Sequence, residues 1–269
     1  MNVKAGQQNA TILYTGIMSD NLYKPDNKSS LFSRVFAMIY ALFAYVVASF
    51  ALFWFFFATL DWAPYALSGK VDHLAASLII NMLLVFLFAA QHSIMARKRF
   101  KQLWTQVIPA HLERSTFVLS AGIAILLILW FWQPAPGVVW SIEQETVRVG
   151  ILGLALFGVG YVVFTTFVTN HFELLGLRQA WLYAVGKPYT IIDFKRRWVY
   201  RYSRHPMMLG LLIVFWSTPD MTVDRLVLAL LLTVYLFIGI RFEERSLIAE
   251  YGDSYKAYQK KVGMFFTWR

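Results

Sequence analysis

The densest chemical pattern in the chain is the stretch YRYSRHPMMLG at residues 200–210. Proline suits the first turn of a helix, where its missing N–H has no intrahelical partner to lose. A helix that starts at Pro206 would direct free backbone N–H groups and its positive dipole end toward Arg204 and His205. This arrangement predicts an anion site for a carboxylate or a phosphate. One turn later, Gly210 permits close approach of another helix or of a ligand.

A second candidate element is the sequence RFEER at residues 241–245. Glu243 and Glu244 emerge together from the end of an apolar run, so they could accept hydrogen bonds from ribose hydroxyls or from an amine. Alternatively, they pair with the two flanking arginines. Either way, they are expected to lie at the boundary between membrane and water.

Several tyrosines lie within or after these two elements. Tyr251, Tyr255 and Tyr258 are spaced i, i+4 and i+7, which on one helix would form an aromatic stripe. Such a stripe docks on lipid headgroups or stacks on a ligand ring. Tyr202, inside the first motif, is a further candidate for ligand contact.

Groups that could act as a base lie in two other places. His92 stands at the end of an apolar run, one turn before the basic cluster at residues 97–99. It would either hydrogen-bond between helices or line a site from the membrane side. The other place is the stretch 165–179, which holds Thr166, Asn170, His171, Glu173 and Arg178. A solvated helix end or a pocket wall would account for this density of polar groups.

The composition places these motifs in a membrane protein. Of 269 residues, 58% are hydrophobic and only 15% are charged, whereas soluble domains are about 25% charged. The 25 Lys and Arg residues exceed the 15 Asp and Glu residues by ten. They lie in short clusters between apolar runs, which argues against nucleic-acid binding. The absence of cysteine excludes disulfides, thiolate metal sites and a cysteine nucleophile, and no metal is expected.

Four apolar runs are long enough to cross a hydrocarbon core of about 30 Å. A helical hairpin follows them, with a short first arm and a nearly full-length second arm. We therefore expect an all-α, polytopic helical bundle with five to six membrane helices and a cytoplasmic C-terminal helix. The expected spans are Leu31 to Leu60, Leu74 to Ala96, Ser115 to Trp132, Val149 to Thr169, the short arm Met207 to Trp216, and Val223 to Ile240.

Segments rich in Lys and Arg alternate with near-neutral loops along the chain. The positive-inside rule therefore places both termini in the cytoplasm. Residues 1–30 form a polar cytoplasmic segment without the features of a removable signal peptide. Residues 31–269 form one membrane domain, whose polar mass lies at about residues 170–269. A membrane domain of this kind contacts lipids. The sequence does not indicate the oligomeric state.

The two C-terminal elements carry a resemblance. Arg-His-Pro-x-x-x-Gly at residues 204–210, a hairpin turn, the Glu-Glu pair and the following Glu-Tyr-Gly-x-x-Tyr-x-x-Tyr are similar to the isoprenylcysteine carboxyl methyltransferase and phospholipid methyltransferase group. Those membrane enzymes use S-adenosylmethionine without a Rossmann domain. The resemblance implies that Arg204, His205, Pro206 and Gly210 hold the cofactor with Glu243 and Glu244, and that Tyr251 or Tyr255 covers the adenine.

The upstream half resembles a narrower family. Gln-His-Ser at residues 91–93 and NHFELLGLRQ at residues 170–179 are similar to the membrane methanethiol S-methyltransferases and the related denitrification-linked NnrU-type proteins. The resemblance implies methyl transfer from S-adenosylmethionine to methanethiol, giving dimethyl sulfide and S-adenosylhomocysteine. It also implies a bacterial inner-membrane location.

A small alkane thiol must lose its proton to attack efficiently, so the site needs a base or a cationic partner. The candidates are His171, His92 and Arg178, in that order. Two alternatives stay open. The first is methylation of a larger lipid or prenylated acceptor. The second is a haem or nitrogen-oxide-linked protein with His92 and His171 as axial ligands.

Overall fold

The computed structural model describes residues 29–67, 73–190 and 198–267 of the chain. Most of the N-terminal segment expected at residues 1–30 therefore lies outside the described residues. Five helices in the described part are long and apolar enough to cross a membrane. They are α1 (Leu31–Thr59), α2 (Leu74–Met95), α4 (Ala110–Phe131), α5 (Glu145–Thr169) and α9 (Val223–Tyr251).

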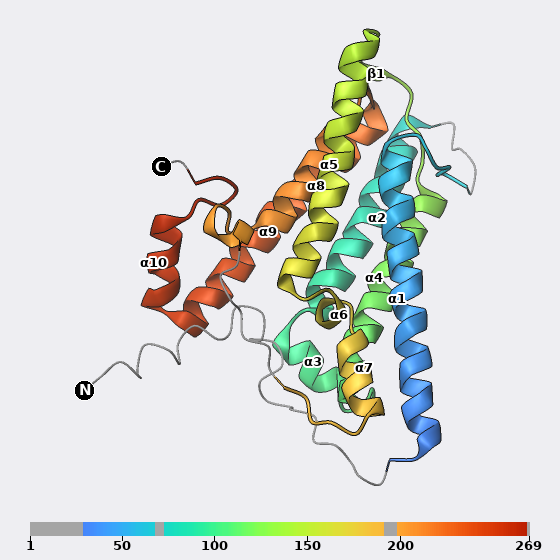
Figure 1. Cartoon of the computed structure of the whole chain (residues 1–269). Helices are drawn as coiled ribbons and strands as arrows, with labels where there is room; N and C mark the ends of the chain where they lie inside the picture. Colours follow the sequence, from blue (N-terminus) through green and yellow to red (C-terminus); the bar gives the residue numbers. More distant parts are fainter. Residues whose placement is uncertain (1–28, 68–72, 191–197, 268–269) are drawn as a thin grey trace.

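The expected all-α membrane bundle is confirmed (Figure 1). In lipid, every backbone polar group must be satisfied within its own segment, and a helix does this for any apolar sequence. Large apolar side chains such as Phe43, Phe86 and Phe157 are 56%, 69% and 57% exposed. In water these would be costly, whereas in a bilayer they face lipid. The chain is an integral membrane protein.

The short arm of the hairpin is α8 (Pro206–Trp216), whose 11 residues span about 16 Å. It lies against α5 (Figure 1). The contact is tight because glycines face each other: a Cβ on Gly158 would lie 2.9 Å from Ile213, and one on Gly210 would lie 2.8 Å from Val162. The sequence left open whether Gly210 approaches a helix or a ligand, and in the structure it contacts helix α5.

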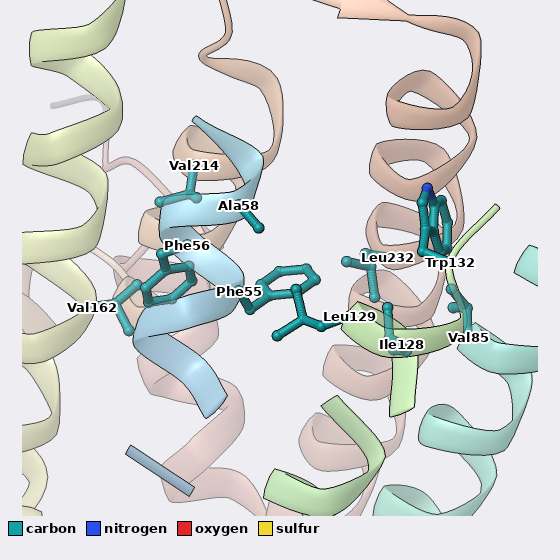
Figure 2. Close-up of a cluster of buried hydrophobic side chains, with 10 residues drawn as sticks. All are labelled: Phe55, Phe56, Ala58, Val85, Ile128, Leu129, Trp132, Val162, Val214 and Leu232. Atoms are coloured by element: carbon teal, nitrogen blue, oxygen red, sulfur yellow. The ribbon is translucent and has the colours of Figure 1, made fainter. Parts of the chain in front are cut away.

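One buried cluster joins six helices in the membrane part of the bundle (Figure 2). Phe55 and Phe56 of α1 lie at its centre, and Trp132 closes one side at the end of α4. The other members come from α2, α4, α5, α8 and α9, and a tightly packed cluster of this kind fixes the helices relative to one another. They are Val85, Ile128, Leu129, Val162, Val214 and Leu232, and Ala58 of α1 completes the cluster.

Two short strands were not expected. Strand β1 (Val138–Ser141) pairs antiparallel with β2 (Asp220–Thr222) at the end of the bundle where α5 begins (Figure 1). Arg148 holds Asp220 through two hydrogen bonds of 3.0 and 2.7 Å, and Ser141 donates a third of 2.6 Å. These contacts lower the pKa of Asp220.

The opposite end of the bundle carries four short helices. They are α3 (Lys98–Trp104), α6 (His171–Leu174), α7 (Leu177–Ala184) and α10 (Asp253–Lys261), and a single 3₁₀ turn, η2 (Trp198–Arg201), precedes α8. The polar elements of the sequence therefore gather at this end, where the chemistry was expected (Figure 1).

Candidate functional site

The Arg-His-Pro motif is held in place by the C-terminal tail. The backbone N–H groups of Arg204 and His205 donate to the carbonyls of Gly263 and Met264, both at 3.1 Å. The N-cap of α8 is His205, and Pro206 occupies the first turn as expected. The segment before α8 and the tail after α10 thus form one rigid edge.

Glu244 is the hub of the charged contacts at this edge. Its Oε1 accepts from Arg204 Nε at 2.7 Å and from His205 Nε2 at 2.9 Å, and its Oε2 accepts from Gln259 at 3.0 Å. Arg204 also donates to the carbonyl of Val262 at 2.7 Å. Of the two expected uses of the Glu-Glu pair, Glu244 pairs with an arginine, but the partner is Arg204 rather than a flanking residue.

His205 is almost fully buried between the two carboxylates. Its Nδ1 lies 3.6 Å from Glu243 Oε2. Burial alone would lower the pKa of His205, but the hydrogen bonds and charges of Glu243 and Glu244 outweigh it and raise the pKa. The imidazole is therefore stabilised in its cationic form.

A shallow pocket that opens to solvent lies against this network. Glu243 faces it, whereas Glu244 stands behind the wall. Desolvation and the charges of Glu244 and Glu243 raise the pKa of Tyr255, so this phenol stays neutral. The lining residues come from η2, the start of α8, α9 and α10: Tyr200, Arg204, His205, Pro206, Met207, Met208, Glu243, Leu247, Tyr255 and Tyr258.

Besides Glu244, three expected ligand-binding residues do not line this pocket. Tyr202 is 69% exposed. Gly210 packs against α5, and the hydroxyl of Tyr251 donates to Glu250. The tyrosine stripe is interrupted, because Gly252 adopts φ +53 and separates α9 from α10. The lining residues that the sequence reasoning did not single out are Tyr200, Met207, Met208 and Leu247, although the first three lie within the motif.

His171 belongs to a separate cluster at the junction of α5 and α6. Thr166 Oγ1 donates to the carbonyl of Val163 at 2.6 Å, so it accepts from His171 Nδ1 at 2.8 Å. Nε2 is then free to accept from the Tyr45 hydroxyl of α1 at 3.0 Å. Phe167 stacks on the ring at 4.3 Å. Burial lowers the pKa of His171, and both of its nitrogens are bonded within the protein.

Arg178 is also engaged. Its Nη1 lies 2.8 Å from Glu173 Oε2, and its guanidinium stands 5.4 Å over the ring of Tyr189. Gln179 donates to the other oxygen of Glu173 at 2.8 Å. This network ties α6 to α7 and the segment after it.

His92 has different surroundings. Its ring contacts Phe117 of α4 at a centroid distance of 4.8 Å and Phe88 at 5.5 Å. Within the described residues its Nδ1 is buried and has no hydrogen-bond partner. The two histidines considered as haem ligands thus contact different sets of residues. No group of three His, Asp or Glu side chains suited to a metal ion occurs in the described part of the chain.

Comparison with known proteins first gives the class. The phospholipid methyltransferase family matches residues 149–254, which run from α5 into α10 and include the motif and the Glu-Glu pair. This part of the chain thus belongs to a methyltransferase family. No solved structure matches the chain.

The curated relatives then give the particular family. The chain is 44% identical to the methanethiol S-methyltransferase of Mycobacterium tuberculosis over 203 residues, which are 74% of this chain and 83% of the relative. It is 39% identical to methanethiol S-methyltransferase 1 of Bradyrhizobium diazoefficiens over 91% of this chain and 87% of the relative. The chain is 31% identical to human nurim over 64% of this chain and 68% of nurim. The chain belongs to the methanethiol S-methyltransferase family and is an enzyme.

Proposed function

We propose that this protein transfers a methyl group from S-adenosylmethionine to methanethiol, giving dimethyl sulfide and S-adenosylhomocysteine. The observation that carries the proposal is the high identity to two methanethiol S-methyltransferases over most of the chain. The same observation favours a small thiol over a larger lipid acceptor and over a haem protein. The domain is residues 31–269, with the cofactor half at about residues 170–269.

The pocket has groups that suit S-adenosylmethionine. The Glu243 carboxylate can accept from its amine or ribose hydroxyls, and Tyr255 and Tyr258 offer aromatic faces for the adenine. The ligand's carboxylate needs a cation, and His205 is the residue whose charge is stabilised beside the pocket. Arg204 orients Glu244 and the pocket edge.

Methyl transfer from a sulfonium to a thiolate is an in-line displacement that removes charge. The protein therefore contributes mainly alignment and exclusion of water. Methanethiol and dimethyl sulfide are apolar, so both can enter and leave through the bilayer. We further propose a bacterial inner-membrane location with both termini in the cytoplasm, where S-adenosylmethionine is made.

The test uses purified protein in detergent with labelled S-adenosylmethionine and methanethiol. We expect labelled dimethyl sulfide in the headspace in proportion to enzyme. Binding of S-adenosylmethionine without this product would refute methanethiol as the acceptor. Labelled long-chain thioethers or methyl esters in its place would support the lipid acceptor.

A further inference from the structure

The cytoplasmic end of α2 has two buried polar atoms without a hydrogen-bond partner among the described residues, Gln91 Oε1 and His92 Nδ1. A buried acceptor without a donor costs about 1–3 kcal/mol, so each such atom needs a physical explanation, and a catalytic role is one of them. The histidine of α6 differs in this respect, because both nitrogens of His171 are hydrogen-bonded.

The surroundings of His92 are aromatic. Phe117 and Phe88 contact its ring, and Tyr235 of α9 meets Phe88 at a centroid distance of 6.0 Å. Sulfur contacts aromatic rings favourably, and a thiol S–H is a small, weak donor. A thiol that carries a charged group elsewhere would lose its hydration here, and the unpaired imidazole nitrogen would not offer it an ion pair.

The position of this cluster relative to the pocket is set by the pairing of α2 with α9. Ser93 and Tyr235 approach at 3.3 Å, and just past the end of α2 the guanidinium of Arg97 stands 4.5 Å over Phe242. Phe242 is the residue before Glu243, which faces the pocket. Met207 lines the pocket and also packs on the buried cluster that Phe88 contacts. The His92 cluster therefore lies on the membrane side of the pocket, along the same helices.

From this arrangement we infer that His92, Phe88, Phe117 and Tyr235 form the acceptor subsite, with His92 Nδ1 as the base for small, uncharged alkane thiols. This inference rests on the proposed function and assigns its acceptor side. The thiol S–H bond breaks and its proton moves to Nδ1. The sulfur forms a bond to the methyl carbon of the sulfonium, whose bond to the donor sulfur breaks and leaves its electron pair there. The imidazolium then returns its proton to the cytoplasm.

Two charged or titratable groups from neighbouring helices belong to this environment. Arg114 of α4 stands 4.7 Å over Phe117, on the ring that contacts His92. Tyr235 is the phenol on the α9 side. A cation near the thiol favours the thiolate, so Arg114 would stabilise the nucleophile.

The experiment compares His92→Gln with His73→Gln, a matched change at the exposed N-cap of the same helix. Each variant is assayed with ethanethiol and with trifluoroethanethiol, which is close in size but far more acidic. For His92→Gln we expect a loss of about 10²-fold with ethanethiol and less than tenfold with trifluoroethanethiol, because the latter needs no base. His73→Gln should match the wild type with both thiols.

S-adenosylmethionine affinity is measured on the same samples, and unchanged affinity shows that the cofactor pocket is intact. The inference is overturned if His92→Gln keeps full activity with ethanethiol, or loses activity equally with both thiols while binding the cofactor normally. If wild-type protein methylates no thiol, the proposed function itself fails.

A second variant serves if His92→Gln does not fold. Phe117→Leu replaces the ring that contacts His92 with a smaller side chain and so leaves more room for the acceptor. The ratio of kcat/KM for propanethiol to kcat/KM for methanethiol should therefore rise at least about fivefold. An unchanged ratio would contradict the placement of the acceptor beside Phe117.

Discussion

At the scale of single residues, adjacent carboxylates have separate tasks. Glu244 is bonded on both oxygens by Arg204, His205 and Gln259, whereas the Glu243 side chain is 34% exposed and faces the pocket. Two neighbouring residues on a helix point about 100° apart, which is why one can support the wall while the other faces the ligand.

Substituting each carboxylate separately should distinguish the two tasks. Glu243→Gln should weaken S-adenosylmethionine binding by roughly tenfold and lower thermal stability less than Glu244→Gln does, because inside the protein it loses only the 3.6 Å ion pair with His205. Glu244→Gln should lower the free energy of unfolding by about 2 kcal/mol, because it leaves Arg204 half-compensated in a largely buried place. Calorimetric titration and thermal unfolding in detergent measure the two effects. Equal stability losses in both variants would contradict this division.

The histidine between them predicts a pH dependence of stability. Since the folded pKa of His205 is raised, its contribution is complete below about 6.5, the ordinary value, and is lost as pH rises through the folded pKa. Wild-type protein should therefore lose thermal stability on going from neutral to alkaline pH. His205→Gln should show a flatter dependence. The exposed His73→Gln serves as control, and an equal slope in all three proteins would refute the assignment.

At the scale of helices, sequence predicted the spans well and their ends less well. The first four expected spans lie within a few residues of α1, α2, α4 and α5, because apolar runs can only be helical in lipid. Helix α9 continues to Tyr251, eleven residues past the expected end at Ile240. Hydropathy indicates only where the apolar part of a helix ends, and a helix can continue into water. The strands β1 and β2 have four and three residues, and they pair across about 80 positions, which no local pattern reveals.

The α5–α8 contact gives a prediction with an internal control. A Cβ on Gly158 would lie 2.9 to 3.1 Å from α8, whereas one on Gly160 would meet nothing within 4 Å. Gly158→Ala should therefore push α8 away and lower stability by about 1–3 kcal/mol. Because α8 begins at Pro206, cofactor affinity should fall too. Gly160→Ala, two residues along the same helix, should be neutral in both thermal unfolding and cofactor titration. A neutral Gly158→Ala would show that the helices are not in close contact.

At the scale of the whole molecule, the sequence marks the residues around the pocket more clearly than the residues around His92. The Arg-His-Pro motif and the Glu-Glu pair are 39 residues apart, yet both carry charge at a membrane boundary and so stood out. The acceptor cluster consists of phenylalanines, a tyrosine and one histidine from α2, α4 and α9. Phe88 lies one helical turn before His92 on α2, but nothing local marks Phe117 among the 23 Phe residues, and only the packing of α4 and α9 on α2 brings Phe117 and Tyr235 into the cluster.

The orientation of the molecule is testable because the chain contains no cysteine. Val139→Cys, in the exposed strand β1, should react with a membrane-impermeant maleimide in intact spheroplasts. Ser254→Cys, exposed on α10, should react only after the membrane is opened. This follows from the basic clusters, which the positive-inside rule keeps on the cytoplasmic side together with the pocket. Labelling of Ser254→Cys in intact spheroplasts would place the cofactor site outside the cell, where S-adenosylmethionine is not made, and would refute the proposed topology and function together.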